Sequence, residues 1–324
     1  MTARRTFLAA TAGTLLAAAA LPSRAQGQYP NRPVRMIVPF PAGGAADLSA
    51  RIVAQSLAAG LGQPVVIDNR GGADGAVAGN AVISSSPDGY TLLFATNTGL
   101  NYAPVIRKQP PYDPLTAFTP ISLVGKFGFF LFVHESVPAM TVPEFLAYVH
   151  ANPGKLNYAS GNSTSILTTA QLALAEKLDM LHVPYKGDAP ATLDLIAGRV
   201  QMMIATPGSA MQQVAEGRLR VLAVHLRNRS PLAPEAPTAV EAGLRGLTIT
   251  PWTGLFGPAG LPREVTERVA REMRTVAANP EVKAALARLA FEAQASTPEE
   301  LAAFLKEQLD LWRKTAQEVG LERN

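Results

Sequence analysis

Residues 35–49 read RMIVPFPAGGAADLS and contain the transition that decides the fold. An apolar run ends at Pro39, two glycines follow at Gly43 and Gly44, and a helical pattern begins around Asp47. A buried strand that passes into a helix through a short turn is typical of α/β proteins. The two glycines leave two interpretations open: the turn is tight, or another group approaches the backbone closely at this point.

The rest of the chain repeats this alternation of short apolar segments and helical patterns. Further strands are expected at 64–69, 91–96, 127–133, 156–160, 180–185, 200–205, 219–225 and 249–256. Short apolar strands between helices predict parallel sheets and the α/β class. After Pro262 the chain is expected to be helical throughout. Its last helix starts at a Thr297 cap and places an apolar stripe, from Leu301 to Val319, against the sheet.

The expected elements divide into two α/β lobes. Lobe 1 comprises residues 26–128 together with 250–324, and lobe 2 comprises 129–249. Two extended crossings, near 129–133 and 249–256, would join the lobes. Without its first 25 residues the chain has 324 − 25 = 299 residues, which is near the length at which one hydrophobic core gives way to two.

Residues 1–25 have the pattern of a cleavable secretory signal. Arg4 and Arg5 lie near the start, an apolar stretch follows, and a small-x-small site ends at Ala25, so cleavage is expected before Gln26. The arginine pair is compatible with the twin-arginine route and with the general secretory route, and both are left open. Because the chain has no cysteine, it has neither disulfides nor a lipoprotein anchor, which suits a bacterial periplasm.

The charge balance argues against a nucleic-acid partner. The chain has 29 basic and 25 acidic residues, and the signal contains three arginines and no acid, which leaves 29 − 3 = 26 basic residues. A net charge of 26 − 25 = +1 offers no basic surface for nucleic acid or an anionic membrane. No later segment is apolar enough to span a bilayer, and a water-soluble monomer is expected.

The sequence contains little that points to catalysis. It has no metal-ligand spacing and no dinucleotide or Walker motif, so no cofactor is expected. Residues 161–165, GNSTS, are a near miss to the G-x-S-x-G motif of serine hydrolases, with Ser163 at the nucleophile position. An exported hydrolase is therefore kept as a remote alternative. The simpler interpretation is a helix start at which Ser163 or Thr164 satisfies free N–H groups.

Two strand-to-helix turns share a similar chemistry. Residues 40–47 and 160–165 are both rich in small residues, and each opens a helix. Free N–H groups and the helix dipole at such a position attract an anion, and a carboxylate can be held there without an arginine. Two such turns, in separate lobes at the carboxyl ends of strands, predict a cleft that grips a ligand from both sides.

Several stretches resemble one family along nearly the whole chain after the signal. They are YPNRPVRMIVPFPAGGAAD (29–47), VVIDNRGGADGAVAGNAV (65–82), SPDGYTLLF (86–94), ANPGKLNYAS (151–160), HVPYKGDAPATLDLIAGRVQMM (182–203), PTAVEAGL (237–244) and PWTGLFGPAGLP (251–262). The chain resembles the extracytoplasmic substrate-binding receptors of tripartite tricarboxylate transporters, the Bug receptors. This resemblance implies a two-lobed periplasmic binding protein of type II that closes on a small organic acid and delivers it to membrane permease subunits. A module that feeds a sensor instead of a transporter is left open.

The resemblance also implies which residues meet the ligand. In lobe 1 they are Phe40, Pro41, Ala42, Gly43, Gly44 and Asp47. In lobe 2 they are Ser160, Gly161, Asn162, Ser163, Thr164, Tyr185, Lys186, Gly187, Ala205 and Thr206. For Asp47 a structural role, capping or pairing with Arg51 one turn later, is favoured over a contact with the ligand, because a carboxylate would repel an anion.

One departure from the family bears on the ligand. Amino-acid binders of the family carry an acid after the strand at 200–205, where this chain has Ala205, Thr206 and Pro207. An amino acid is therefore expected to bind poorly, because a desolvated ammonium without a partner costs about 1–3 kcal/mol. The identity of the acid is left open. The donors of the 160–164 turn favour a dicarboxylate over a monocarboxylate.

Overall fold

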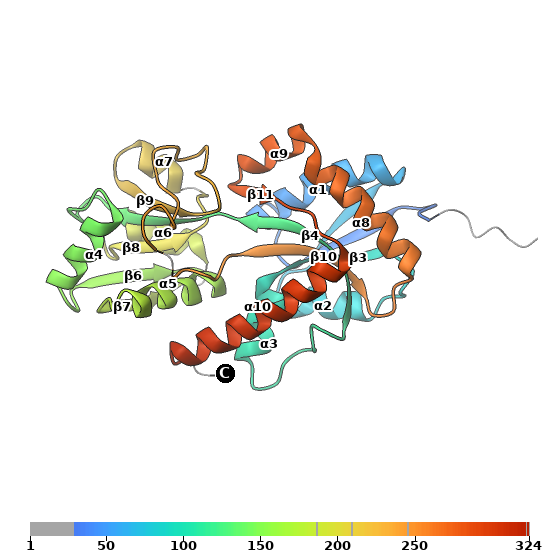
Figure 1. The fold of residues 1–324 in the computed structure, drawn as a ribbon, viewed down its shortest axis with the longest axis horizontal. Coiled ribbons are helices and arrows are strands. Elements are labelled where there is room, and N and C mark those ends of the chain that lie inside the picture. The colour runs from blue at the N-terminus through green and yellow to red at the C-terminus, as the bar shows by residue number, and fades with distance from the viewer. Residues whose placement is uncertain (1–28, 186, 209, 245, 322, 324) are drawn as a thin grey trace, which may run out of the picture.

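The computed structural model describes residues 29–185, 187–208, 210–244, 246–321 and 323. The expected signal at 1–25 and its cleavage site lie outside these residues. The described chain forms two sheets, each covered by helices on both faces, and Figure 1 shows them as two lobes side by side. The chain has the α/β class and the two-lobed architecture that the sequence predicts.

The sheet of lobe 1 has six strands in the order β11-β4-β10-β3-β1-β2. The strands are β1 (Val34–Val38), β2 (Val65–Asn69), β3 (Thr91–Thr96), β4 (Phe118–Phe127), β10 (Trp252–Pro258) and β11 (Phe291–Ala293). β1 pairs in parallel with β2 and β3, whereas β10 runs antiparallel to β3 and β4. The prediction of purely parallel sheets is thus wrong, because the returning chain enters this sheet in the opposite direction.

The sheet of lobe 2 has five strands in the order β7-β6-β8-β5-β9. They are β5 (Phe129–His134), β6 (Leu156–Ser160), β7 (Met180–Pro184), β8 (Met202–Ala205) and β9 (Leu219–His225). β6 is parallel to β7 and β8, and β5 is antiparallel to β8 and β9. The register opposes Ser160 to Pro184, so the turns that follow β6 and β7 leave the same edge of the sheet.

Three strand assignments from the sequence need correction. The segment 127–133 is not one strand, since Gly128 separates β4 from β5, and the N–H of Gly128 donates to the Ala290 carbonyl at 2.6 Å. β4 was not expected at all. The region after Pro262 is not entirely helical, because β11 adds a short edge strand beside β4.

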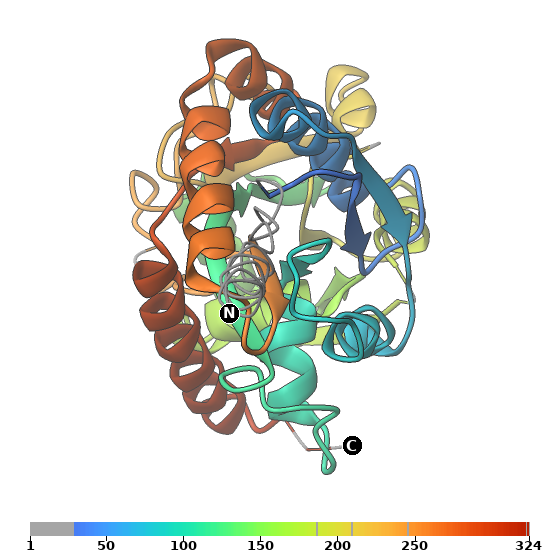
Figure 2. The same ribbon diagram turned by 90° about the vertical axis from the view of Figure 1, so that its right-hand side faces the viewer.

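The core of lobe 1 follows from the alternation of side chains along β1. Met36 and Val38 face one cluster of buried residues with α1, α8 and α9, whereas Ile37 faces the opposite cluster with α2, α3 and α10. The helices and helical turns are α1 (Ala45–Leu61), η1 (Ala73–Gly75), α2 (Ala76–Ile83), η2 (Thr98–Tyr102), α3 (Ala103–Ile106), α8 (Arg263–Ala278), α9 (Pro280–Ala287) and α10 (Pro298–Glu318). Figure 2 shows α8 (orange) and α10 (red) along one side of the lobe.

The last helix confirms its sequence-based prediction. Thr297 caps α10, and Glu300 completes a capping box by accepting the N–H of Thr297. Leu301, Leu305, Leu309 and Trp312 are buried in the core of lobe 1, and Val319 is partly buried. Burial of such side chains stabilises the fold by about 1.5–3 kcal/mol each.

Lobe 2 is built in the same way around β5. Phe129 and Leu131 face one cluster, and Phe130 and Phe132 face the other. The helices of this lobe are α4 (Val142–Ala151), α5 (Ser163–Ala175), α6 (Asp188–Ile196) and α7 (Ala210–Ala215). Five successive residues from Phe129 to Val133 are all buried, because β5 is an inner strand between β8 and β9 with helices on both faces of the sheet.

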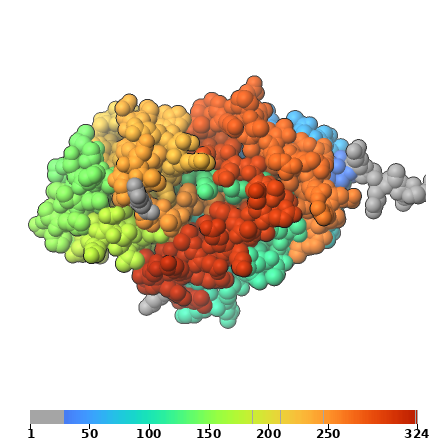
Figure 3. Space-filling view, in the orientation of Figure 1, coloured from blue at the N-terminus to red at the C-terminus, as the bar shows by residue number. Residues whose placement is uncertain are grey.

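One helix of lobe 2 also packs against lobe 1. Leu167 of α5 is fully buried in the lobe 1 cluster that includes Trp252 and α10. α5 is also bonded to the segment that leads from lobe 2 into β10, because the Thr168 hydroxyl donates to the Ile249 carbonyl at 3.2 Å and the Gln171 side chain bonds to Thr248. Figure 3 shows α10 (red) reaching the surface of lobe 2 beside α5. The lobes are therefore joined on this side by packing as well as by the crossing strands.

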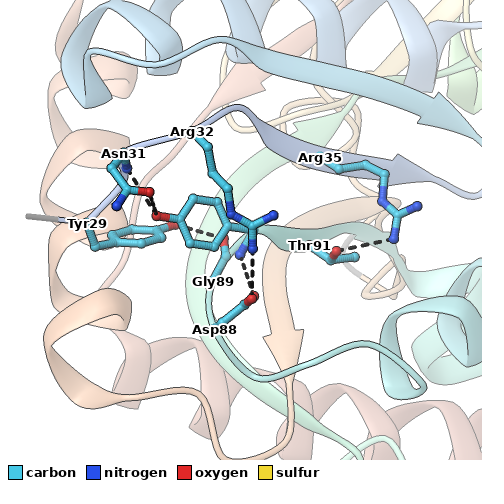
Figure 4. A network of polar contacts seen from close by, with 8 residues as sticks. Tyr29, Asn31, Arg32, Arg35, Asp88, Gly89 and Thr91 are labelled. Atoms are coloured by element: carbon cyan, nitrogen blue, oxygen red, sulfur yellow. Dashed lines mark hydrogen bonds and ion pairs between the residues drawn. The ribbon is translucent and has the colours of Figure 1, made fainter. Parts of the chain in front are cut away.

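The first described residues are fastened to the loop before β3, as Figure 4 shows. The Tyr29 hydroxyl donates to the Gly89 carbonyl at 2.8 Å, and Arg32 pairs with Asp88 at 3.1 Å. Burial holds the pKa of the Tyr29 hydroxyl above its usual range. Within the described ranges, no helix has both the length and the apolar character needed to cross a bilayer.

Candidate functional site

A cavity of about 640 Å³ lies between the two lobes. Lobe 1 contributes the turn before α1, the end of β3 and Phe127, and lobe 2 contributes Phe129 and the starts of α5 and α6. The full lining is Phe40, Pro41, Ala42, Gly44, Ala45, Ala46, Thr96, Asn97, Thr98, Phe127, Phe129, Gly161, Asn162, Thr164, Gly187, Asp188, Ala189, Pro190, Thr206 and Pro251. The volume and the largely apolar lining are those of a small-molecule site.

The amino end of α1 opens directly into this cavity. Gly44 is the N-cap, no side chain caps the helix, and Ala45 and Ala46 line the cavity. The first N–H groups of a helix have no acceptor inside the helix. Here they lie beside the cavity, and the helix dipole adds about half a positive charge at that end. This wall can accept an anion without a cationic side chain.

Gly43 and Gly44 differ in whether their backbone conformation requires a glycine. Gly43 has φ +87°, a backbone conformation that residues with a Cβ rarely adopt. Gly44 has an ordinary φ of −79°, and a Cβ added there would meet only the Pro41 carbonyl oxygen, at 3.9 Å. The tight turn thus explains Gly43 but not Gly44. Nothing in the protein itself requires Gly44, which leaves its bare backbone open toward the cavity.

Asp47 holds the turn before α1 in place through hydrogen bonds. Its carboxylate accepts the Gly43 N–H at 2.9 Å, the Asn69 side-chain amide at 3.0 Å and the Arg51 guanidinium at 3.0 Å. The hydrogen bond from Arg51 lowers the pKa of this carboxyl to about 2, with help from Gly43 and Asn69. The structural interpretation of Asp47, pairing with Arg51, is confirmed. The N–H of Gly43 is used inside the protein and does not face the cavity.

The corresponding turn of lobe 2 is closed by its own side chains. Asn162 is the N-cap of α5 and accepts the Ser165 N–H at 2.9 Å, while Ser165 accepts the Asn162 N–H at 3.2 Å. This capping box satisfies two of the free donors. The expectation that Ser163 or Thr164 provides the cap is wrong, because an asparagine one position earlier has the required extended backbone.

Asp188 is a cavity residue that sequence reasoning missed. It is the first residue of α6, and its carboxylate accepts the Asn162 amide at 2.8 Å and the Thr206 hydroxyl at 3.2 Å. Burial raises the pKa of this carboxyl, and the two hydrogen bonds oppose the shift. The basis for expecting poor binding of amino acids was the lack of an acid beside Thr206. Residues 205–207 do lack an acid, but Asp188 of α6 reaches Thr206, so the lobe 2 wall contains a carboxylate after all, and the expectation itself stays a prediction.

The end of β3 completes the cavity and links the lobes. The side-chain amide nitrogen of Asn97 donates to the Thr164 hydroxyl at 2.6 Å, and its amide oxygen accepts the backbone N–H of Trp252 at 3.3 Å. Thr96 lines the cavity, and its buried hydroxyl has no hydrogen-bond partner among the described residues. Both residues belong to the strand TLLFAT and its continuation, which sequence reasoning treated only as a core strand.

The sequence model described as "Tripartite tricarboxylate transporter family receptor" matches residues 49–321. The chain belongs to this receptor family. It is 38% identical over 318 residues, 97% of this chain and 94% of the relative, to a protein from the tcbD-tcbE intergenic region of Pseudomonas sp. strain P51.

Solved structures give the same assignment. The periplasmic binding protein BugD aligns with a TM-score of 0.76 and 33% identity over 91% of this chain and all of that one. A protein of R. palustris, solved with adipate, aligns with a TM-score of 0.79 and 30% identity over 90% of this chain and 98% of that one. The receptor thus has the fold of periplasmic solute-binding proteins.

The receptor's sequence-predicted site residues divide into two groups. Phe40, Pro41, Ala42, Gly44, Gly161, Asn162, Thr164, Gly187 and Thr206 line the cavity. Gly43, Asp47, Ser160, Ser163, Tyr185 and Ala205 are not part of this lining. Lys186 is outside the described residues. Tyr185, for example, donates its hydroxyl to Asp194 at 2.7 Å and packs on the core of lobe 2.

The catalytic alternative finds no support in the receptor's geometry. No histidine is bonded to Ser163 among the described residues. The serine–histidine contacts there are Ser136 with His134, at 2.8 Å, and Ser160 with His182, at 2.6 Å. Ser160 is 1% exposed and lies outside the cavity lining, and His182 has no carboxylate partner in the described chain. No cluster of His, Cys, Asp or Glu in the described ranges could hold a metal ion.

Proposed function

We propose that this receptor captures a small organic carboxylate in the interlobe cavity and delivers it to the membrane subunits of a tripartite tricarboxylate transporter. The observation that carries the proposal is the uncapped amino end of α1, which opens into a largely apolar cavity at Gly44. The structure of the R. palustris relative with adipate supports a carboxylate as the ligand class.

The binding energy would come from charge-assisted hydrogen bonds between a carboxylate and the N–H groups at the start of α1. Asp47 keeps these groups in place through Gly43 and Asn69. Phe40, Phe127 and Phe129 provide apolar walls for the body of the ligand. Since such a site binds and releases an acid without breaking a bond, we assign no catalytic role and no cofactor to it.

Capture would proceed by closure of lobe 2, residues 129–249, over lobe 1, residues 26–128 and 250–324. The crossings predicted near 129–133 and 249–256 include the paired strands β5 and β10, so the rotation would be absorbed just outside them, at Gly128 and at 249–251, where a few backbone dihedrals can change. We place this function in the periplasm, reached through the signal at 1–25 with cleavage after Ala25. Delivery to permease subunits would follow from recognition of the closed form.

Thermal unfolding tests ligand capture directly. Residues 26–324 are refolded to remove any bound ligand and melted with mono-, di- and tricarboxylates and with the corresponding uncharged amides. A ligand at about 100 times its Kd adds roughly 2.7 kcal/mol to the free energy of unfolding, so carboxylates raise the Tm and amides do not. Equal shifts with amides, or no shift across a wide panel, contradict the proposal.

A filled-site variant provides the matched control. Gly44→Leu places a side chain in the open space above Gly44, where the backbone φ of −79° tolerates it. We expect a normal unfolding transition without ligand and no carboxylate-induced shift. Delivery is tested separately, by uptake of the identified acid in cells that lack either the receptor or the neighbouring permease genes. Uptake that persists without the receptor contradicts the delivery role.

A further inference from the structure

We propose that Asp188 makes the cavity select carboxylates whose far end carries a hydrogen-bond donor, a hydroxyl or an ammonium, over acids with a second carboxylate there. This inference rests on the proposed function and deepens it by naming the ligand class. It also reverses the preference for a dicarboxylate that the sequence favoured.

The carboxylate of Asp188 is held firmly and retains free acceptor capacity. Among the described residues, each of its oxygens has one donor, Asn162 on one side and Thr206 on the other. An ionised carboxylate offers about four lone-pair sites, so about two remain. Asp188 lines the cavity, and these remaining sites can accept a donor from the ligand.

Close packing against the neighbouring turn fixes the position of Asp188. A Cβ at Gly161 would lie 2.5 Å from the Asp188 backbone nitrogen and Cα. The turns after β6 and β7 are in contact because Ser160 opposes Pro184 in the register. A side chain fixed by its neighbours loses little entropy when a ligand donor binds to it.

The charges of the two cavity walls are opposite in character. The wall of lobe 1 presents the positive end of the α1 dipole, and its one nearby carboxylate, Asp47, is paired with Arg51. The wall of lobe 2 presents Asp188, and no Lys, Arg or His is among the described residues that line the cavity. Like charges brought together in a partly desolvated site repel strongly. A second ligand carboxylate would meet this repulsion at the lobe 2 wall.

The positive dipole of α5 does not offset this repulsion for the ligand. Its amino end is covered by the Asn162 and Ser165 side chains, and the Asn162 amide already bonds to Asp188. α6 also starts at this wall, at Gly187 and without a side-chain cap, but its first residue is Asp188, whose own carboxylate offsets that dipole. The protein's own carboxylate thus occupies the position at which the sequence suggested a second ligand carboxylate. Burial raises the pKa of the Asp188 carboxyl, which agrees with limited access of water to this wall.

Calorimetric titration of residues 26–324 with four six-carbon acids at pH 7.5 tests the inference. The acids are hexanoate, 6-hydroxyhexanoate, 6-aminohexanoate and adipate, which share one carboxylate and differ at the far end. A four-carbon set with the same four termini repeats the comparison for a shorter ligand. We expect the donor-terminated acids of at least one set to bind at least tenfold more tightly than the dicarboxylate of the same length.

Two amide variants separate the local effect of Asp188 from net charge. Asp188→Asn keeps the shape and can keep both protein contacts, and it should shrink the donor-over-dicarboxylate ratio at least tenfold. Asp179→Asn removes the same charge at an exposed position of lobe 2 and should leave the ratio unchanged. Lys186→Met is included because Lys186 lies close in sequence, and the preference should persist in it.

The outcomes are distinguishable. Tighter binding of the dicarboxylate in both sets, or a ratio that Asp188→Asn does not change, overturns this inference and leaves the proposed function standing. The inference is also overturned if the donor-over-dicarboxylate ratio changes equally in Asp179→Asn. It is overturned as well if the preference for donor-terminated acids is lost in Lys186→Met. If no carboxylate of any kind binds to the wild-type chain, the proposed function fails and this inference fails with it.

Discussion

The turns before α1 and α5 resemble each other in sequence, yet they present different chemistry to the cavity. In the turn at 40–47, the N-cap of α1 is Gly44, which has no side chain to cap the helix. The first N–H groups of α1 therefore lie uncapped beside the cavity. The turn at 160–165 ends in Asn162, whose side chain caps the helix and also holds Asp188. The residue at the N-cap therefore decides whether a helix start serves a ligand or the fold.

The glycines of the two turns differ in the same way. Gly161 is required by the protein, because the backbone of Asp188 occupies the space of a Cβ. A Cβ at Gly44 would make only an ordinary contact, with the Pro41 carbonyl oxygen at 3.9 Å. Small residues in a turn can thus indicate close packing between two parts of the chain or room for a ligand. Four experiments test this comparison.

The largest change in the free energy of unfolding is expected from Gly161→Ala. A Cβ there would lie 2.5 Å from backbone atoms of Asp188, and such overpacking costs about 3 kcal/mol because backbone must move. Gly44→Ala should change the free energy of unfolding by less than about 0.5 kcal/mol. Urea unfolding of both variants measures the difference. Equal destabilisation would show that the two glycines have the same structural role.

Asp47→Ala should destabilise the receptor by about 2 kcal/mol, since it removes a charged acceptor from Gly43, Asn69 and Arg51. The pKa of Asp47 is about 2 in the folded chain and about 4 in an unfolded chain. Its charge therefore stabilises fully above about pH 5, and this contribution is lost as the pH falls through about 4 to 2. The stability difference between wild type and variant should shrink in that window. A difference that stays constant down to pH 2 contradicts the assignment.

Removal of one N–H from each helix start compares the two turns as ligand sites. Ala45→Pro deletes the first N–H of α1 at a position that proline tolerates, and it should weaken carboxylate binding about tenfold, since a hydrogen bond to a charged group contributes at least about 1.5 kcal/mol. Ser163→Pro is the equivalent change in α5 and should cost much less affinity. Calorimetric titration measures both. A larger loss in Ser163→Pro would reverse the roles of the turns.

The smallest effect is expected from the cap of α5. Asn162→Ala removes the capping box and should destabilise the fold by about 1 kcal/mol. Asn162→Asp keeps an acceptor for the Ser165 N–H but places a second carboxylate beside Asp188, so it should lose the contact between the two side chains. Chemical unfolding distinguishes these variants. No change in either would show that the capping box contributes nothing to stability.

Much of the fold could be predicted from local sequence. The bounds of β3, β6 and β9 agree with the expected strands, because each is a short apolar run between clear breaks. β4 was missed because Pro120, Gly125 and Lys126 interrupt its apolar pattern. It is stabilised by β10 and β11, which lie far away in sequence, and such pairing leaves no local trace.

The turn at 40–44 in lobe 1 could be predicted from sequence, whereas Asp188 in lobe 2 could not. The turn at 40–44 is contiguous in sequence, so its composition alone indicates an anion site. Asp188 and Asn162 meet only because β6 and β7 are neighbours in register, and no local pattern shows which strands pair. The one signal was an acidic residue at the first position of a helix after a glycine, which by itself usually indicates a favourable helix dipole.

The burial of Leu167 of α5 within the core of lobe 1 has a consequence for folding. Lobe 1 is assembled from two distant parts of the chain, and its hydrophobic cluster is complete only when a helix from lobe 2 is present. Neither lobe can then reach its full stability while the other is unfolded. The receptor should therefore melt in one cooperative calorimetric transition, with equal van't Hoff and calorimetric enthalpies, despite its two-lobed shape.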